Sequence, residues 1–148
     1  VGPLIMGIKN LCFSSDGRYL AASALDDDHS IAIYDMNAAK KGGAIAPIAS
    51  GKGSRAVLFS LTFNPAGNQL VSTGVNEVNF YSFDGGRFTK KTGTGMAIKT
   101  TVLSSAFVGE TLFTGCLTGE IMQWAGNAMK SANKSHTAKV SALFAKDN

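Results

Sequence analysis

The chain has 148 residues, 45% of them hydrophobic and 16% charged, which is enough to form one domain with an apolar core. Its formal net charge of +4 is too small to indicate nucleic-acid binding by itself, and no aromatic and basic RNA-binding motif accompanies it. Its longest apolar runs cover only a few residues, so we expect no membrane span, and the first residues lack the charged and apolar regions of a signal peptide.

One sequence pattern recurs along the chain. It consists of apolar residues at similar spacing followed by a turn, and it has four copies: Ile8–Phe13, Leu58–Phe63, Val102–Phe107 and Val140–Ala145. Successive copies begin 50, 44 and 38 residues apart, and these spacings bracket the roughly 40–45 residues of a four-stranded β-propeller blade. The 17 glycines and only 3 prolines are typical of short strands joined by tight turns.

The residues between these copies divide into further strands, which we take in chain order. In the first repeat (8–57) we expect strands at 19–24, 31–35 and near 47–49. In the second repeat (58–101) we expect them at 69–73, 78–82 and 87–90, and in the third (102–139) at 111–114, 120–124 and near Met129. Turn residues such as Asp16-Gly17 and Asp84-Gly85-Gly86 separate the strands.

The sequence therefore predicts an all-β protein, a β-propeller fragment of about three four-stranded antiparallel blades plus one extra strand at 140–145. Because a propeller needs about four to eight blades to close, we expect residues 1–148 to form an open arc of a longer propeller. Its uncovered apolar faces are expected to pair with a second copy or with the remainder of its own propeller. Ten residues are expected in the core by their repeat positions: Leu11, Phe13, Leu20, Ile33, Leu61, Phe63, Leu70, Phe107, Leu112 and Ile121.

The repeats resemble WD40 repeats, whose third strand ends in a Trp-Asp pair. Tyr34-Asp35, Tyr81-Ser82 and Gln123-Trp124 occupy that place, and we expect their aromatic rings to pack between blades. His136 stands four residues before the last copy, where a WD40 repeat carries the His that bonds a buried Asp. Ser54 and Ile98 replace this His in the second and third repeats, so packing is expected to dominate over the usual hydrogen-bond network.

Several segments in order narrow the resemblance to the echinoderm microtubule-associated protein-like (EML) family. They are Asp26–Asp35 with its acidic-His insertion, Asn79–Gly85, Thr114–Trp124 and Ser135-His136-Thr137. The resemblance implies that this stretch is part of the first of two tandem propellers. It also implies that the protein binds tubulin or microtubules in the cytoplasm, at the cytoskeleton. Two alternatives stay open: a general WD40 adaptor in a complex unrelated to tubulin, and a non-catalytic propeller attached to an enzyme elsewhere in the parent chain.

No residue set indicates catalysis, a cofactor or a metal. The glycine-containing segments 51–54 and 93–95 complete neither phosphate-binding motif. The run Asp26-Asp27-Asp28-His29 is interpreted as a solvated turn, because consecutive residues on a hairpin tip cannot all converge on one ion. Cys12 and Cys116 lie in apolar strand patterns and are interpreted as buried thiols of a reducing compartment.

Basic residues are concentrated between the third strand of one repeat and the first strand of the next, which places them on the outer rim of a propeller. Such a band can simply keep an outer edge strand soluble. It can also attract an acidic protein partner, for which tubulin is the candidate that the resemblance implies. The candidate partner-binding residues are Lys52, Arg55, Arg87, Lys90, Lys91 and Lys99.

Overall fold

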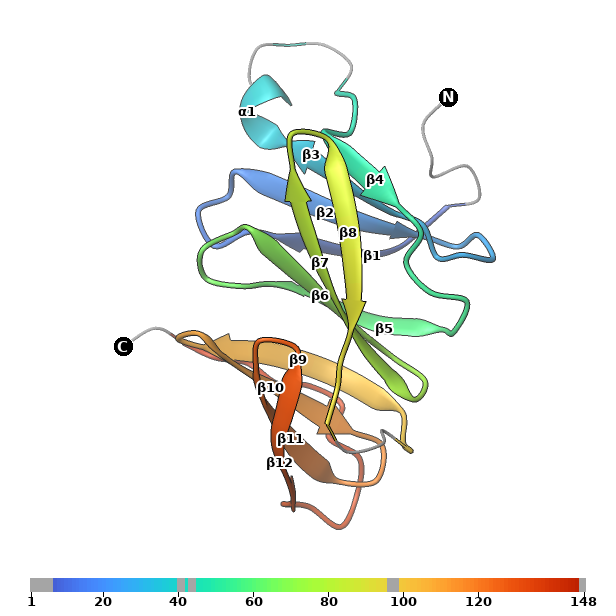
Figure 1. Cartoon of the computed structure of the whole chain (residues 1–148), viewed down its shortest axis with the longest axis vertical. Helices are drawn as coiled ribbons and strands as arrows, with labels where there is room; N and C mark the ends of the chain where they lie inside the picture. Colours follow the sequence, from blue (N-terminus) through green and yellow to red (C-terminus); the bar gives the residue numbers. More distant parts are fainter. Residues whose placement is uncertain (1–6, 40–41, 43–44, 96–98, 147–148) are drawn as a thin grey trace.

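A computed structural model of the chain describes residues 7–39, 42, 45–95 and 99–146. Three four-stranded antiparallel sheets follow one another along the sequence. Figure 1 shows the first in blue and cyan, the second in green and yellow and the third in orange and red. In the described ranges, no helix is long and apolar enough to cross a membrane.

Each sheet is a meander in which every strand pairs with the next one along the chain. The first sheet, blade 1, consists of β1 (Ile8–Phe13), β2 (Tyr19–Ala24), β3 (Ile31–Asp35) and β4 (Ala49–Gly51), with a short helix α1 (Met36–Ala39) after β3. Blade 2 consists of β5 (Leu58–Phe63), β6 (Gln69–Gly74), β7 (Glu77–Asp84) and β8 (Arg87–Thr92). Blade 3 consists of β9 (Val102–Val108), β10 (Thr111–Cys116), β11 (Glu120–Ala125) and β12 (Ala128–Lys134).

These strands confirm the predicted all-β class and the three four-stranded blades. The expected fourth strand of blade 1, near 47–49, begins slightly later, at Ala49. The extra strand expected at 140–145 is absent from the described part of the chain. Val140 is held there by its backbone N–H, which donates to the Cys116 carbonyl, and by its carbonyl, which accepts from Ser104 Oγ. The residues after it form no ladder, because a strand needs a neighbouring strand to pair with.

The turn between the first and second strands has the same backbone hydrogen bond in blades 1 and 2, as expected for an internal repeat. In blade 1 the Gly17 N–H donates to the Ser14 carbonyl, and in blade 2 the Gly67 N–H donates to the Asn64 carbonyl, both at 2.9 Å. Gly17 and Gly67 have positive φ values of 68° and 70°, a conformation in which a side chain is strained. Glycine at this turn therefore sets the pairing of the first two strands in both blades.

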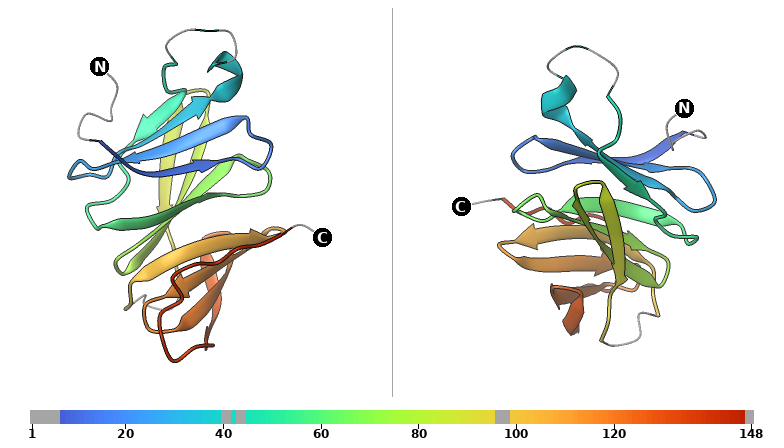
Figure 2. Two further views of the ribbon diagram at one scale, coloured as in Figure 1. Left: turned by 180° about the vertical axis from the view of Figure 1, so that it is seen from behind. Right: turned by 45° about the horizontal axis from the view of Figure 1, so that its top comes forward.

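The blades stack so that their first strands are neighbours: β1 contacts β5 and β5 contacts β9, while β4 contacts β8. The two views in Figure 2 show the same succession of sheets from behind and with the top of the molecule turned forward. One apolar cluster fills the space between blades 1 and 2 and includes Ile31, Ile33, Phe63, Leu70 and Tyr81. A second fills the space between blades 2 and 3 and includes Val71, Phe80, Leu112, Met122 and Trp124.

The predicted core is confirmed where a residue lies between two blades. Ile33, Leu61, Phe63, Leu70 and Leu112 are buried, and Leu20, Phe107 and Ile121 are half-buried. The prediction is wrong for Leu11 and Phe13, which are each 59% exposed, whereas the equivalent Leu61 and Phe63 are only 8% and 7% exposed. Leu61 and Phe63 pack against blade 1. Leu11 and Phe13 lie on the opposite side of blade 1 from blade 2, where no described sheet covers them.

Candidate protein-interaction surfaces

The connection from blade 1 to blade 2 brings together charged residues from three segments. Asp28 lies in the β2–β3 loop, and its Oδ2 is 2.8 Å from Lys52 Nζ in the β4–β5 connection. Arg55, in the same connection, places its Nε 3.8 Å from Asp28 Oδ1. Lys90 on β8 donates from Nζ to the Gly53 carbonyl at 2.9 Å. We call Asp28, Lys52, Arg55 and Lys90 the junction cluster.

Backbone contacts fix the loop that carries Asp28. The Asp26 carboxylate accepts a hydrogen bond from the Ser30 N–H at 2.8 Å. His29 has a positive φ of 43°, and its Nδ1 donates to the Ser54 carbonyl at 2.8 Å. A Cβ on Gly53 would lie 2.2 Å from the His29 carbonyl oxygen, so only glycine permits this approach. The β2–β3 loop, which the sequence predicts to be a solvated turn, is therefore held against the β4–β5 connection by these contacts.

The charges of the junction cluster are unbalanced. The Lys52 ammonium, which is hydrogen-bonded to Asp28, and the charges of Arg55 and Lys90 hold the pKa of the Asp28 carboxyl below its ordinary value. Asp28 is therefore ionised at neutral pH. Two cations lie beside this carboxylate and the third, Lys90, contacts the neighbouring Gly53 carbonyl. The side chains of Lys52 and Arg55 are 77% and 90% exposed. The four residues of the junction cluster thus carry net positive charge, and the further carboxylates Asp26 and Asp27 lie in the same loop as Asp28.

The other three predicted partner-binding residues lie outside the junction cluster. Arg87 begins β8 and is paired in register with Asp84. Lys91 is exposed on β8, on the face opposite to its neighbour Lys90 because side chains alternate along a strand. Lys99 is exposed in the connection to blade 3 and borders a small hollow with Thr118 and Glu120. The structure thus groups Lys52, Arg55 and Lys90 and separates Arg87, Lys91 and Lys99 from them.

The aromatic residues at the Trp-Asp places of blades 2 and 3 lie between blades, as predicted. Tyr81 stacks on Phe88 with ring centroids 5.2 Å apart, and its hydroxyl is 3.1 Å from Ser72 Oγ. Burial raises the pKa of Tyr81 to about 12. Trp124 lies 5.8 Å from Phe80 and donates from Nε1 to Thr114 Oγ1 at 3.0 Å. In both blades a hydroxyl side chain on the second strand forms a hydrogen bond with the polar group of the aromatic residue on the third strand. The repeat pattern of the sequence does not predict this pairing.

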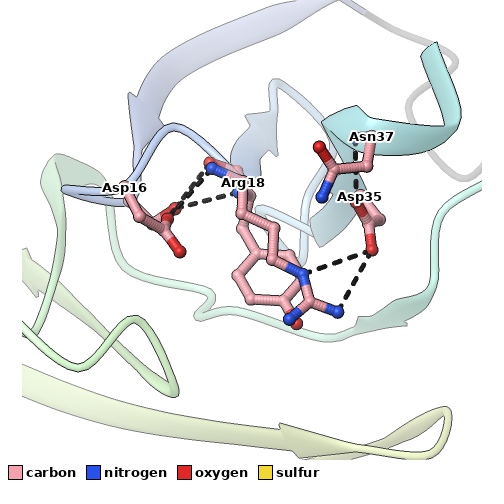
Figure 3. Close-up of polar contacts among 6 residues, drawn as sticks. Asp16, Arg18, Asp35 and Asn37 are labelled. Atoms are coloured by element: carbon pink, nitrogen blue, oxygen red, sulfur yellow. Dashed lines mark hydrogen bonds and ion pairs between the residues drawn. The ribbon is translucent and has the colours of Figure 1, made fainter. Parts of the chain in front are cut away.

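The same place in blade 1 faces away from the other blades, and its Tyr34 is only half-buried. The neighbouring Asp35 has a structural role (Figure 3). Its carboxylate accepts from the Asn37 N–H at 2.9 Å and pairs with Arg18 Nε at 3.5 Å. The Arg18 backbone N–H in turn donates to Asp16 at 3.0 Å. These contacts tie the β1–β2 turn to the start of α1.

The hydrogen-bonding residues that are usual in WD40 repeats are replaced by other residues in this chain, as the sequence predicts. His136 is exposed, while Ser54, which replaces the equivalent His in blade 2, is buried and accepts from the Ala56 N–H at 3.0 Å. Ile98 lies outside the described residues. The Thr118 hydroxyl oxygen lies 3.0 Å from Thr100 Oγ1 and donates a hydrogen bond to the Glu120 carboxylate.

Both cysteines are free thiols. Burial raises the pKa of Cys12 to about 12 and that of Cys116 to about 11. Both thiols are therefore protonated at neutral pH, which makes them poor nucleophiles. The expected burial is confirmed for Cys116, whereas Cys12 is only half-buried.

Comparisons with known proteins agree with this architecture. Residues 6–35 match the family model for the WD domain, G-beta repeat. The fold is similar to the computationally designed Ika8 protein (TM-score 0.71, 20% identity, 96% of this chain and 41% of that chain). It is also similar to the computationally designed Ika4 protein (TM-score 0.71, 21% identity, 97% of this chain and 82% of that chain).

A natural structure with the same fold is the Cps50 (Swd1) β-propeller domain of Myceliophteria thermophila (TM-score 0.72, 13% identity, 91% of this chain and 44% of that chain). The chain thus spans less than half the length of this propeller and of Ika8. Together with the three antiparallel sheets, these matches show that the chain comprises three blades of a β-propeller, and the match to a WD40 repeat covers the first part of blade 1, at residues 6–35.

Proposed function

We propose that the chain is a non-catalytic protein-interaction scaffold that binds an acidic partner through the junction cluster. The observation that carries this proposal is that Lys52 and Arg55 lie beside Asp28, while Lys90 reaches the same connection and is hydrogen-bonded to the Gly53 carbonyl. Exposed cations on a rigid sheet framework attract an acidic surface over long range and orient it on approach. Here the framework is the contact between blades 1 and 2, which holds all three segments in place.

The partner that we propose is tubulin or the microtubule, which would place the protein in the cytoplasm at the cytoskeleton. The sequence resemblance to the EML family supports this choice, and so does the positive charge of the cluster, which suits an acidic protein surface. A general WD40 adaptor role remains the alternative, and binding to tubulin distinguishes the two.

Two charge-reversal variants of equal net charge test where the partner binds. One replaces Lys52, Arg55 and Lys90 of the junction cluster with Glu, and the other replaces Arg87, Lys91 and Lys99 with Glu. We expect the first to weaken binding to microtubules roughly tenfold or more at low salt, because surface charge contacts are strong only when little screened. We expect a much smaller loss in the second variant. Co-sedimentation at two salt concentrations measures both the affinity and its salt dependence.

Circular dichroism of both variants shows whether the fold is intact. Equal losses in the two variants would mean that total charge, and not the junction cluster, decides binding. If neither variant changes affinity or salt dependence, the basic rim only keeps the protein soluble. If the unaltered protein does not bind tubulin, the adaptor alternative replaces the tubulin proposal.

We also propose that the outer face of blade 1 packs against another blade, supplied by a second copy when the chain is alone. Leu11 and Phe13 lie on this face, where their repeat equivalents in blade 2 are covered by blade 1. An exposed apolar group of this kind favours association. We expect light scattering to show self-association at micromolar concentration, and we expect the double substitution Leu11→Lys and Phe13→Glu to reduce it. A stable monomer of the unaltered chain at that concentration would contradict the proposal.

A further inference from the structure

One carboxylate of the protein already occupies the junction cluster. Asp28 is hydrogen-bonded to Lys52 at 2.8 Å and lies 3.8 Å from Arg55. A carboxylate of an acidic partner would bind to the same two cations, Lys52 and Arg55. We propose that Asp28 is an internal competitor, which masks the cluster from weakly acidic partners and selects peptides that carry several adjacent carboxylates. This inference rests on the proposed function of the junction cluster.

The position of Asp28 does not depend on a partner, because its loop is fastened on both sides. The Asp26 carboxylate closes the loop onto the Ser30 N–H, and the His29 side chain anchors it to the Ser54 carbonyl. The close approach of the loop backbone to Gly53 leaves no space for a side chain there. Asp28 is thus held beside Lys52 by contacts within the chain that do not involve the cations of the junction cluster.

Lys52 and Arg55, in contrast, can still bind a partner, because their side chains are exposed to solvent. The Asp28 side chain is 31% exposed, whereas those of Lys52 and Arg55 are 77% and 90% exposed. An ammonium group has three donors and a guanidinium has five, and the Arg55–Asp28 separation of 3.8 Å is longer than a hydrogen bond. Arg55 therefore has its planar donor pairs available for a carboxylate of a partner, and Lys52 has further donors beyond the one that Asp28 uses.

The internal carboxylate determines which acidic partners bind. A single external carboxylate meets cations whose field Asp28 has partly cancelled, so it gains little. A run of carboxylates contacts Lys52, Arg55 and Lys90 together, and its combined attraction exceeds the repulsion from Asp28. Specificity of this kind arises from a built-in repulsive group as well as from attractive ones.

The test compares Asp28→Asn with Asp27→Asn in the full chain. Both substitutions remove one negative charge from the same loop, but Asp27 is exposed and has no ion pair among the described residues. The probes are a labelled oligoglutamate peptide and a serine-rich peptide with a single glutamate, measured by fluorescence anisotropy at low and high salt. We expect Asp28→Asn to bind oligoglutamate about two- to fivefold more tightly at low salt, the range of an exposed charge contact.

We expect Asp27→Asn to have a clearly smaller effect and Asp28→Glu, which restores the charge, to bind like the unaltered chain. We also expect Asp28→Asn to narrow the preference for oligoglutamate over the single-glutamate peptide. Equal gains in the two Asn variants, or weaker binding in Asp28→Asn, would overturn the masking role. The failure of the proposed function is a separate result: oligoglutamate would then bind none of these proteins, or would bind the Lys52, Arg55 and Lys90 reversal variant unchanged. Thermal melts of all variants establish that each is folded.

Discussion

Replacement of Phe63 by alanine is expected to destabilise the chain by about 3–5 kcal/mol, the usual range for deletion of a buried aromatic side chain. Phe63 is 7% exposed in the cluster between blades 1 and 2. Its ring meets that of Phe83 edge-on at 6.2 Å. The substitution therefore removes apolar contacts from both blades and leaves a cavity that neither rigid sheet closes easily. Urea unfolding followed by circular dichroism measures the change in free energy of unfolding.

Phe13 provides the matched control, because it holds the equivalent position in the first repeat but is 59% exposed. At a protein concentration low enough to keep the chain monomeric, Phe13→Ala is expected to change the free energy of unfolding by less than about 1 kcal/mol, since most of its surface is then in water. Equal losses for Phe13→Ala and Phe63→Ala in the monomeric chain would show that Phe13 is covered within the chain itself. A negligible loss for Phe63→Ala would show that blades 1 and 2 do not pack as described.

Trp124→Ala is expected to have an effect of the same size, about 3–5 kcal/mol, for a partly different reason. Trp124 is 1% exposed and fills the cluster between blades 2 and 3. Its removal also leaves Thr114 Oγ1, buried at the same place, without the Nε1 donor at 3.0 Å. A buried polar group that loses its partner carries a further cost.

Two companion variants separate these contributions. Trp124→Phe keeps much of the apolar area but not the donor, so it is expected to lose less stability than Trp124→Ala. Tyr34→Ala alters the equivalent place of blade 1, where the side chain is only half-buried, and it should lose least. Because Trp124 is the single tryptophan, backbone circular dichroism during thermal unfolding is the suitable measurement. A loss for Tyr34→Ala that matches Trp124→Ala would contradict the difference between covered and uncovered blades.

Both proposals about the junction cluster depend on the contact between blades 1 and 2. This contact holds the β2–β3 loop and the β4–β5 connection in place, and these two segments carry Asp28, Lys52 and Arg55. A destabilising substitution such as Phe63→Ala would therefore also loosen Lys52, Arg55 and Lys90 relative to one another. For this reason the binding experiments use surface substitutions, which change the charge without altering the core.

The sequence by itself determined the strands and their grouping into blades. Strands and turns are set by residues that are close in the sequence. Apolar residues recur with the spacing of the repeat, and glycines such as Gly17 and Gly67, which have positive φ, lie in the turns that reverse the chain. Antiparallel strands that are joined by short turns pair with their neighbours in the chain. The third-strand aromatics Tyr81 and Trp124 were also predictable, because their place in each repeat is constant.

The tertiary structure alone decided which of the equivalent residues are buried and which of the charges meet. Leu11 and Leu61 have the same place in their repeats, but only Leu61 has another sheet against it. Asp28 and Lys52 come from two segments that the pairing of β3 with β4 brings together, and the stacking of blade 1 on blade 2 adds Lys90, which contacts the Gly53 carbonyl. Strand and turn patterns are set by residues close in sequence, whereas burial and charge contacts depend on the neighbouring sheet, which a local pattern does not specify.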